Sequence, residues 1–359
     1  MTAQSRLLVF TGSYSEASDP GIHVYALSEQ AGELRLLSET SGVKNPTFLH
    51  VDTEHLRVYA IGEMTTAEGA KAGEVLAYAI HPEQGELTLM NRTQSAIAPT
   101  CHVQMDPQHQ YLLISSYHGG AVSLVSLNVD GSVGQMVDSK QHSGKGAHPE
   151  RQDRPHVHSA FFSPDGKYIM VQDLGLDKIY VYTIDREQHK LVLHREVSTH
   201  AGAGPRHFVF HPNAKFAYVI NEVDSTVTFF TYDAEEGSLT GQQTLSTLPE
   251  EGFDGENTCA EITVSKDGRF LYGSNRGHDT IVVYAISEDG TLSTVQHIST
   301  EGGHPRHFAL TPAGDQLLAA NRDSNNIVLF QVDQDNGQLS YTGKQITSPK
   351  PVCVWPVYM

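Results

Sequence analysis

The sequence predicts an all-β fold, a seven-bladed β-propeller in which residues 1–359 form a single domain. Three observations support this prediction. A similar segment recurs along the chain, each copy contains four short strand-like runs, and the two ends of the chain carry complementary parts of one copy. Repeats of about 40–50 residues that each contain four strands are typical of propeller blades.

The copies align on one position, usually a proline, that begins the first expected strand. This position is occupied by Pro46, Pro99, Pro155, Pro205, Cys259, Pro305 and Pro351. In each complete copy a turn follows about eight residues later, as at 163–166 and 265–268, where aspartate and glycine favour a reversal of the chain. The second expected strand comes directly after this turn and includes, for example, residues 168–171 and 270–272.

Two further strands complete each copy. The third is rich in β-branched and aromatic residues, as at 179–182 and 281–284, and such residues are enriched in strands. The fourth follows an acidic turn that contains glycine, as at 237–240 and 290–292. No stretch has a helical period long enough to compete with this interpretation. The pattern therefore predicts a series of four-stranded antiparallel sheets.

The two chain ends predict how the ring of sheets closes. The last copy begins at Pro351 and has only enough chain left for one strand. Near the N-terminus, residues 7–12, 21–27 and 32–37 have the character of the second, third and fourth strands of a copy that lacks its first. We therefore expect the C-terminal strand to join the N-terminal blade, which removes open sheet edges.

Composition narrows the classes of partner. The chain has 42 acidic and 24 basic residues, a net charge of −18, which argues against nucleic acid and anionic membranes as partners. No apolar run approaches the length of a membrane span, and no signal peptide is recognisable, so we expect a cytoplasmic protein. Cys101, Cys259 and Cys353 lie on first strands of different copies and are expected to be buried free thiols.

The stretch 204–222 predicts where the functional residues gather. It contains a strand, a turn near 211–215 and a second strand, so an antiparallel hairpin would place Arg206 opposite Glu222. In every copy, the start of the first strand and the end of the second share one end of the sheet, around the mouth of the central channel. The charged and histidine residues at these positions are His156, His158, Arg206, His207, Glu222, Glu261, Arg276, Arg306, His307 and Arg322.

Several arginines at one channel mouth of an acidic protein predict a site for a small anionic molecule. The pair Arg306 and Arg322 fits an ion-paired scaffold equally well. His156 and His158 have the spacing of two residues on one side of a strand, but no third ligand follows at a diagnostic distance, so we predict no metal site. The polar insertion 141–154 is expected to form a flexible rim over the pocket, and the insertion 65–73 a similar rim on another blade.

Several segments also resemble a known family. They are residues 45–49, 101–103, 154–158, 172–179, 204–208, 221–222, 260–265 and 274–277. Their order and spacing are similar to those of the seven-bladed propeller lactonases, which include cycloisomerase-type 6-phosphogluconolactonases and the fungal 3-carboxy-cis,cis-muconate lactonizing enzyme. The resemblance covers essentially the whole chain. One departure is residues 115–120, Ser-Ser-Tyr-His-Gly-Gly, where many members have Asn-Tyr before the two glycines.

The resemblance implies a catalytic group at the channel mouth, formed by His158 (or His156), Arg206, Glu222 and Arg276. The same mouth is expected to bind substrate through His156, His102, His207, Asn221, Glu261, Asn275 and Arg306. The proposed reaction requires no metal and no organic cofactor.

The preferred hypothesis is a metal-independent lactone hydrolase, most simply a 6-phosphogluconolactonase. Arg206 and Arg276 would bind the substrate anion and the developing oxyanion, and Glu222 or His158 would accept the proton of the attacking water. A carboxymuconate-type cycloisomerase needs a similar set of residues. A non-catalytic propeller that binds a sugar acid or a protein is the alternative from another class, because a fold does not determine a function. The residues leave the lactone and the oligomeric state open.

Overall fold

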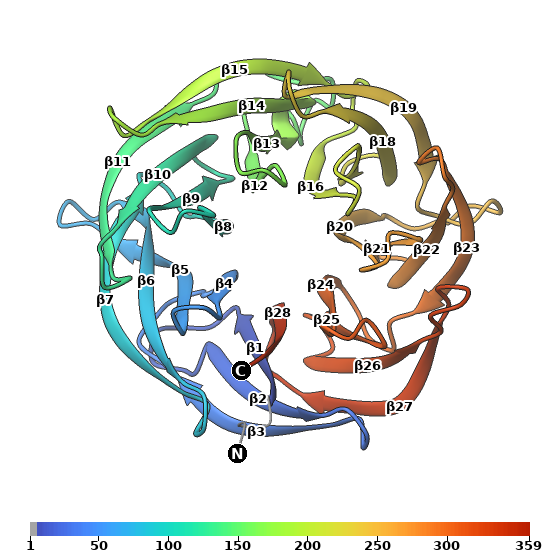
Figure 1. Ribbon diagram of the computed structural model, residues 1–359, viewed down its shortest axis with the longest axis horizontal. Coiled ribbons are helices and arrows are strands. Elements are labelled where there is room, and N and C mark those ends of the chain that lie inside the picture. Colours follow the sequence, from blue (N-terminus) through green and yellow to red (C-terminus); the bar gives the residue numbers. More distant parts are fainter. Residues whose placement is uncertain (1–5) are drawn as a thin grey trace.

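The computed structural model describes residues 6–359, which form seven four-stranded antiparallel sheets arranged as a ring around a central channel (Figure 1). Within the described residues the one helical segment is a short 3₁₀ turn, Leu174–Leu176. The seven-bladed propeller predicted from the repeats is therefore confirmed.

The strand nearest the channel comes first in each sheet. Sheet 1 contains β28 (Pro351–Tyr358), β1 (Leu7–Ser13), β2 (Ile22–Ser28) and β3 (Glu33–Thr40). Sheet 2 contains β4 (Leu49–Asp52), β5 (Arg57–Thr65), β6 (Lys71–His81) and β7 (Glu86–Ala96). Sheet 3 contains β8 (His102–Met105), β9 (Tyr111–Ser116), β10 (Ala121–Leu127) and β11 (Val133–Gln141).

The remaining four sheets repeat this order. Sheet 4 contains β12 (Val157–Phe162), β13 (Ile169–Asp173), β14 (Lys178–Asp185) and β15 (Lys190–Ser198). Sheet 5 contains β16 (Pro205–Phe210), β17 (Phe216–Asn221), β18 (Thr226–Asp233) and β19 (Ser238–Ser246). Sheet 6 contains β20 (Thr258–Val264), β21 (Phe270–Arg276), β22 (Thr280–Ile286) and β23 (Leu292–Ser299). Sheet 7 contains β24 (Pro305–Leu310), β25 (Gln316–Asn321), β26 (Asn326–Val332) and β27 (Leu339–Thr347).

The ring closes where β28 pairs with β1. The ladder runs antiparallel from Leu7 opposite Tyr358 to Ser13 opposite Pro351. In Figure 1 the red C-terminal strand lies beside the blue N-terminal sheet, on its channel side. The predicted closure is thus confirmed, and the inner edge of β1 is fully paired.

The apolar core lies between neighbouring sheets because side chains alternate along each strand. On β17, Val219 packs with Met170 and Val181 of sheet 4. Its neighbour Tyr218 points the other way and packs with Leu271 of sheet 6. The core therefore does not depend on the channel wall, whose side chains can be polar.

The predicted rim at 65–73 needs correction. The insertion 65–73 does not form a separate rim, because β5 and β6 continue through it as a long hairpin in which Thr65 pairs with Lys71.

Residues 6–359 contain no helix that has the length and hydropathy needed to cross a membrane.

Candidate active site

Five first strands carry a β-bulge near one mouth of the channel. In sheet 5, Pro205 pairs with Asn221 and His207 pairs with Ile220, so Arg206 has no partner in the ladder. The equivalent bulges leave unpaired His158 in sheet 4, Ala260 and Glu261 in sheet 6, Arg306 in sheet 7 and Val352 in sheet 1. A bulge redirects the extra side chain. Arg206 and Glu222 thus meet because of a bulge, and not as directly opposed residues of the regular hairpin that we expected.

Glu222 lies at the centre of a cluster of arginines. Its Oε2 atom accepts a hydrogen bond from Arg206 Nε at 3.0 Å and lies 2.8 Å from Arg276 Nη2. Its Oε1 atom accepts a hydrogen bond from Arg151 Nη2. All except Arg151 are almost completely buried. The carboxylate is therefore held by cations from three separate segments of the chain.

These contacts determine the charge states in the cluster. Burial alone would favour the neutral acid, but Arg276, Arg206 and Arg151 outweigh it and hold the pKa of Glu222 well below its usual range. Burial, together with Arg276 and Arg306, lowers the pKa of Arg206 to about 9, which leaves its guanidinium charged at pH 7. Glu222 is thus a fixed anion and a very weak base.

A cavity of about 260 Å³ opens directly beside the cluster. Its polar lining includes Glu222, Arg306, His158, Tyr117 and Glu63. With Arg151, Arg206 and Arg276 behind it, the cavity has four guanidinium groups and two carboxylates around it. This local excess of positive charge, in a protein of net charge −18, favours the binding of a small anion in the cavity.

Sequence reasoning missed Arg151 and Tyr117, as well as Glu63 and His118 of the cavity lining. Arg151 comes from the insertion 141–154, which we expected to be a flexible rim. The insertion is instead anchored by the fully buried Gln152, whose amide donates to Leu174 O and to Asp177 Oδ1. Tyr117 lies in the segment where the sequence departs from the family pattern, and its ring stacks on His156 at a centroid distance of 4.2 Å.

Of the two histidines that line the cavity, His118 and His158, the second lies nearer the arginine cluster. Its ring meets the edge of Tyr117 at 5.8 Å, whereas His156 lies behind Tyr117 and its Nδ1 contacts Tyr117 O at 3.0 Å. Burial, together with Arg206 and His207, lowers the pKa of His158 well below its usual value. The imidazole is therefore neutral at pH 7, and its Nδ1 is buried without a hydrogen-bond partner. A neutral imidazole can accept a proton, and the lowered pKa makes this one a weaker base than an ordinary histidine.

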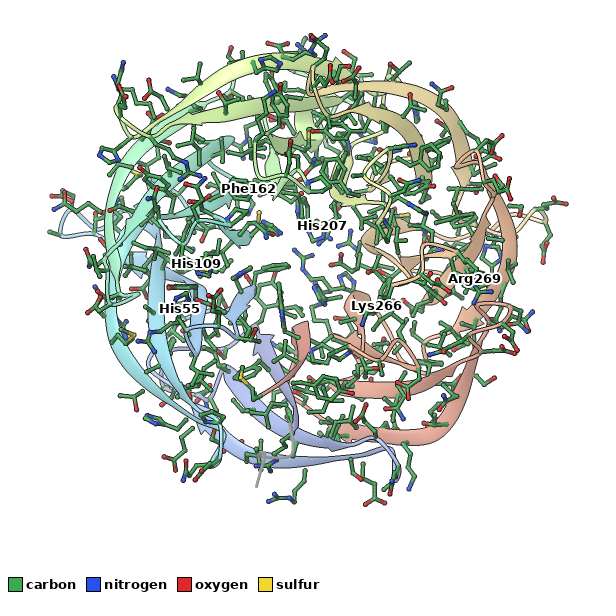
Figure 2. All side chains as sticks on the ribbon, in the orientation of Figure 1. His55, His109, Phe162, His207, Lys266 and Arg269 are labelled. Carbon is green, nitrogen blue, oxygen red and sulfur yellow. The ribbon has the colours of Figure 1, made fainter. Side chains whose placement is uncertain are left out.

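A belt of four rings closes the channel beneath this cavity: Phe48, His102, His207 and His307. The ring centroids of Phe48 lie 4.4 Å from His102 and 5.5 Å from His307, and His102 and His207 are 5.5 Å apart. Glu261 bridges two of the rings, with its oxygens 3.1 Å from His207 Nδ1 and 3.2 Å from His307 Nε2. Figure 2 labels His207 near the centre of the ring of sheets.

The belt separates the cavity from a second one at the other end of the channel. This second cavity has a volume of about 620 Å³ and is lined mainly by apolar side chains such as Phe161, Phe162 and Leu310. His102, His207 and Glu261, which we expected to bind substrate, line this second cavity and not the one beside Glu222. They lie one level deeper in the channel than the arginine cluster.

Other predicted residues support the site from behind. Asn221 and Asn275 are fully buried, and their amides donate to Thr226 and Thr280 of neighbouring strands. Arg306 lines the cavity, but Arg322 does not and binds Asp323 instead. All three cysteines are free, and burial raises the pKa of Cys101, which lines the cavity, to about 12. A thiolate nucleophile is therefore disfavoured.

Comparison with known proteins identifies the family. Residues 8–356 match the family model described as lactonase, 7-bladed β-propeller. The chain belongs to the seven-bladed β-propeller lactonase family. This confirms the resemblance seen in the sequence, and the protein is a lactonase.

Three relatives illustrate the range of this lactonase family. A Bacillus subtilis protein named 6-phosphogluconolactonase is 35% identical over 354 residues, 98% of each chain. The crystal structure of a putative 6-phosphogluconolactonase from Bacteroides uniformis has a TM-score of 0.90 and 34% identity, over 99% of this chain and 100% of its own. The periplasmic gluconolactonase of Pseudomonas aeruginosa also has a TM-score of 0.90, with 30% identity over 98% of this chain and 99% of its own.

Proposed function

We propose that this lactonase hydrolyses a phosphorylated sugar lactone, most simply 6-phosphoglucono-δ-lactone to 6-phosphogluconate. The observation that carries the proposal is the cavity beside Glu222, where guanidinium groups from four segments gather and a neutral histidine forms part of the lining. Arginine binds phosphate and carboxylate oxygens through charge-assisted hydrogen bonds. Family membership favours this enzyme over a non-catalytic propeller.

We assign the roles from charge state and exposure. His158 is the base that takes a proton from the attacking water, because it is neutral and lines the cavity. We prefer it to His118, which also lines the cavity, because Arg206 and Arg276 act on His158 and not on His118. Glu222 is not the base in this scheme, since three arginines keep it ionised and occupied. It holds Arg206 and Arg276 in position, and their charge stabilises the oxyanion that forms on the lactone carbonyl.

Arg306 and Arg151 are the arginines we assign to the substrate phosphate. Arg306 lines the cavity, and the side chain of Arg151 is about one third exposed above Glu222. One structural neighbour is named gluconolactonase, a name that refers to a lactone without phosphate. A phosphorylated substrate is found inside cells, so a cytoplasmic location belongs to the same proposal.

The substrate assignment predicts a preference that depends on Arg306. We expect a higher kcat/KM for 6-phosphogluconolactone than for gluconolactone, measured with a pH indicator. Arg306→Ala should reduce the preference by about 10- to 100-fold, since a hydrogen bond to a charged group contributes about 1.5–3 kcal/mol. Equal kcat/KM for both lactones in both proteins would contradict the phosphate assignment. Turnover of carboxymuconate instead, followed by its ultraviolet absorbance, would favour the cycloisomerase.

The role of His158 predicts a flat pH profile. A base whose pKa is lowered stays unprotonated at mildly acidic pH, so kcat/KM for gluconolactone should not fall between pH 8 and about pH 6. The unphosphorylated lactone is the right substrate, because a phosphate would titrate in the same range. Initial rates are corrected for spontaneous hydrolysis. A fall with its midpoint near 6.5, the ordinary pKa of histidine, would show that the base is not the buried His158.

A further inference from the structure

A second group of potential ligands lies far from the arginine cluster, where sheets 2 and 3 meet. Asp52 ends β4, His55 follows in the β4–β5 turn, and His109 lies in the β8–β9 turn. First strands run from the arginine cluster towards these turns, so the group is on the opposite face of the propeller. Figure 2 shows His55 and His109 near each other and outside the channel where His207 is labelled.

The three side chains present one ligand atom each to a common point. Asp52 Oδ2 lies 3.0 Å from His55 Nδ1 and 3.4 Å from His109 Nδ1, and all three atoms are within 4.8 Å of one another. Zinc bonds to nitrogen and oxygen are about 2.0–2.2 Å long, so ligand atoms of a tetrahedral site are about 3.3–3.6 Å apart. The group therefore needs only small side-chain movements to bind one ion.

The surroundings of the group resemble an outer shell of a metal site. Asp52 Oδ1 accepts hydrogen bonds from the backbone N–H groups of Glu54 and His55, which leaves Oδ2 directed at the two rings. Glu54 Oε2 lies 3.5 Å from His109 Nε2, where a carboxylate can orient a ligating histidine. His109 Nδ1 itself is buried and has no hydrogen-bond partner.

The equivalent face elsewhere in the ring shows what a purely structural histidine does. His211, in the β16–β17 turn, accepts from Asn213 N through Nδ1 and contacts Gly268 O through Nε2, so both of its nitrogens are used. The nitrogens of His109 have no backbone partners of this kind and face two carboxylates instead, Asp52 at 3.4 Å and Glu54 at 3.5 Å. An open coordination position is also available, because the group lines a cavity of about 660 Å³.

We propose that Asp52, His55 and His109 bind one Zn²⁺ ion, with a fourth position open to the cavity. Two imidazoles and one carboxylate suit zinc better than magnesium or calcium, which prefer oxygen ligands. The ion would link sheet 2 to sheet 3 and would take no part in lactone hydrolysis at the opposite face. The proposal is independent of the identity of the lactone.

The test is a zinc titration of the full-length protein after removal of metal, with His109→Gly as the main variant. His109 has φ = 55°, and glycines with positive φ occupy the corresponding place in the turns at Gly166, Gly268 and Gly314, so this variant should fold. We expect one equivalent of zinc to bind the native protein. Loss of an outer-shell partner typically weakens metal binding 10- to 100-fold, so loss of a ligand should weaken it by about 100-fold or more.

Two controls make the result decisive. His189→Gly changes another histidine of the same cavity, one that has φ = 53° and contacts Tyr111, and should leave zinc affinity unchanged. His55→Ala should weaken it as His109→Gly does. Zinc should also raise the melting temperature of the native protein but not of His109→Gly. No binding of a single equivalent, or equal affinity in the native and His109→Gly proteins, would overturn the proposal.

Chelation separates this site from catalysis. EDTA should reverse the zinc-dependent rise in melting temperature while lactone hydrolysis continues at an unchanged rate. If hydrolysis stopped with EDTA and returned with zinc in the His109→Gly variant, the metal would act elsewhere, and the His156–His158 pair would become the candidate. Substituted Co²⁺ gives a second readout, because a four-coordinate site should show visible absorption that the variant lacks.

Discussion

Replacing Arg206 with alanine should lower kcat/KM for the lactone by about 10²–10³, the usual cost of removing one preorganised donor from an oxyanion site. Arg206 donates to Glu222 Oε2 at 3.0 Å and to Ala260 O at 2.7 Å, so it supports the site from the centre of the cluster. Its loss leaves Glu222 with Arg276 and Arg151 as partners. We therefore expect a folded protein with a lower melting temperature and a much slower reaction.

The matched control for this variant is Arg322→Ala. Arg322 occupies the position in sheet 7 that Arg276 occupies in sheet 6, at the end of the second strand. The guanidinium of Arg322 binds Asp323, whereas that of Arg276 binds Glu222. Removing it should change kcat/KM by less than a factor of about three. If Arg206→Ala lost stability and kept full activity, the contact between Arg206 and Glu222 would be a structural ion pair, and the catalytic assignment would fail.

Deletion of residues 351–359 should abolish soluble folded protein. It removes all of β28, and with it every partner on the inner edge of β1. It also removes Val352, Cys353 and Val354, which are almost completely buried. Burial of one large apolar side chain contributes about 1.5–3 kcal/mol, and a typical domain has only about 5–15 kcal/mol of stability in total. Soluble yield and thermal unfolding measure the effect.

A shorter deletion provides the comparison. Removing only Tyr358 and Met359 takes away the exposed end of β28 and leaves Pro351–Val357 to pair with β1. This protein should remain soluble, with a modest fall in melting temperature. Normal melting of the chain that lacks 351–359 would mean that β28 is not needed to close the ring.

The ring was predictable because its evidence is repeated. Each turn and strand recurs in several copies, and the incomplete copies at residues 7–37 and 351–359 complement each other. The gathering of Arg206, Glu222 and Arg276 also followed from topology, since first-strand starts and second-strand ends share one end of each sheet. The strand pattern within each copy and the closure of the ring by the two chain ends predict the same fold, so the two lines of evidence reinforce each other.

The details of the site could not be predicted from the sequence, for physical reasons. A bulge adds one residue to a short strand without changing its apolar pattern, so the unpaired position of Arg206 is not visible in the sequence. Topology gives the end of a sheet and not the depth along the channel, so His207 and Glu261 were placed beside the substrate. Arg151 comes from a loop without periodicity, and its contact with Glu222 depends on how Gln152 anchors that loop.

The closure of sheet 1 by β28 has a consequence for synthesis. Sheets 2 to 7 are each built from consecutive segments and can pair as they leave the ribosome. Sheet 1 cannot, because β1 is made first and β28 last. At 5–20 residues per second, the inner edge of β1 waits roughly 20–70 s for its partner. During that time an unpaired strand is open to pairing with another nascent chain, so closure is the stage at which swapped or aggregated products would arise.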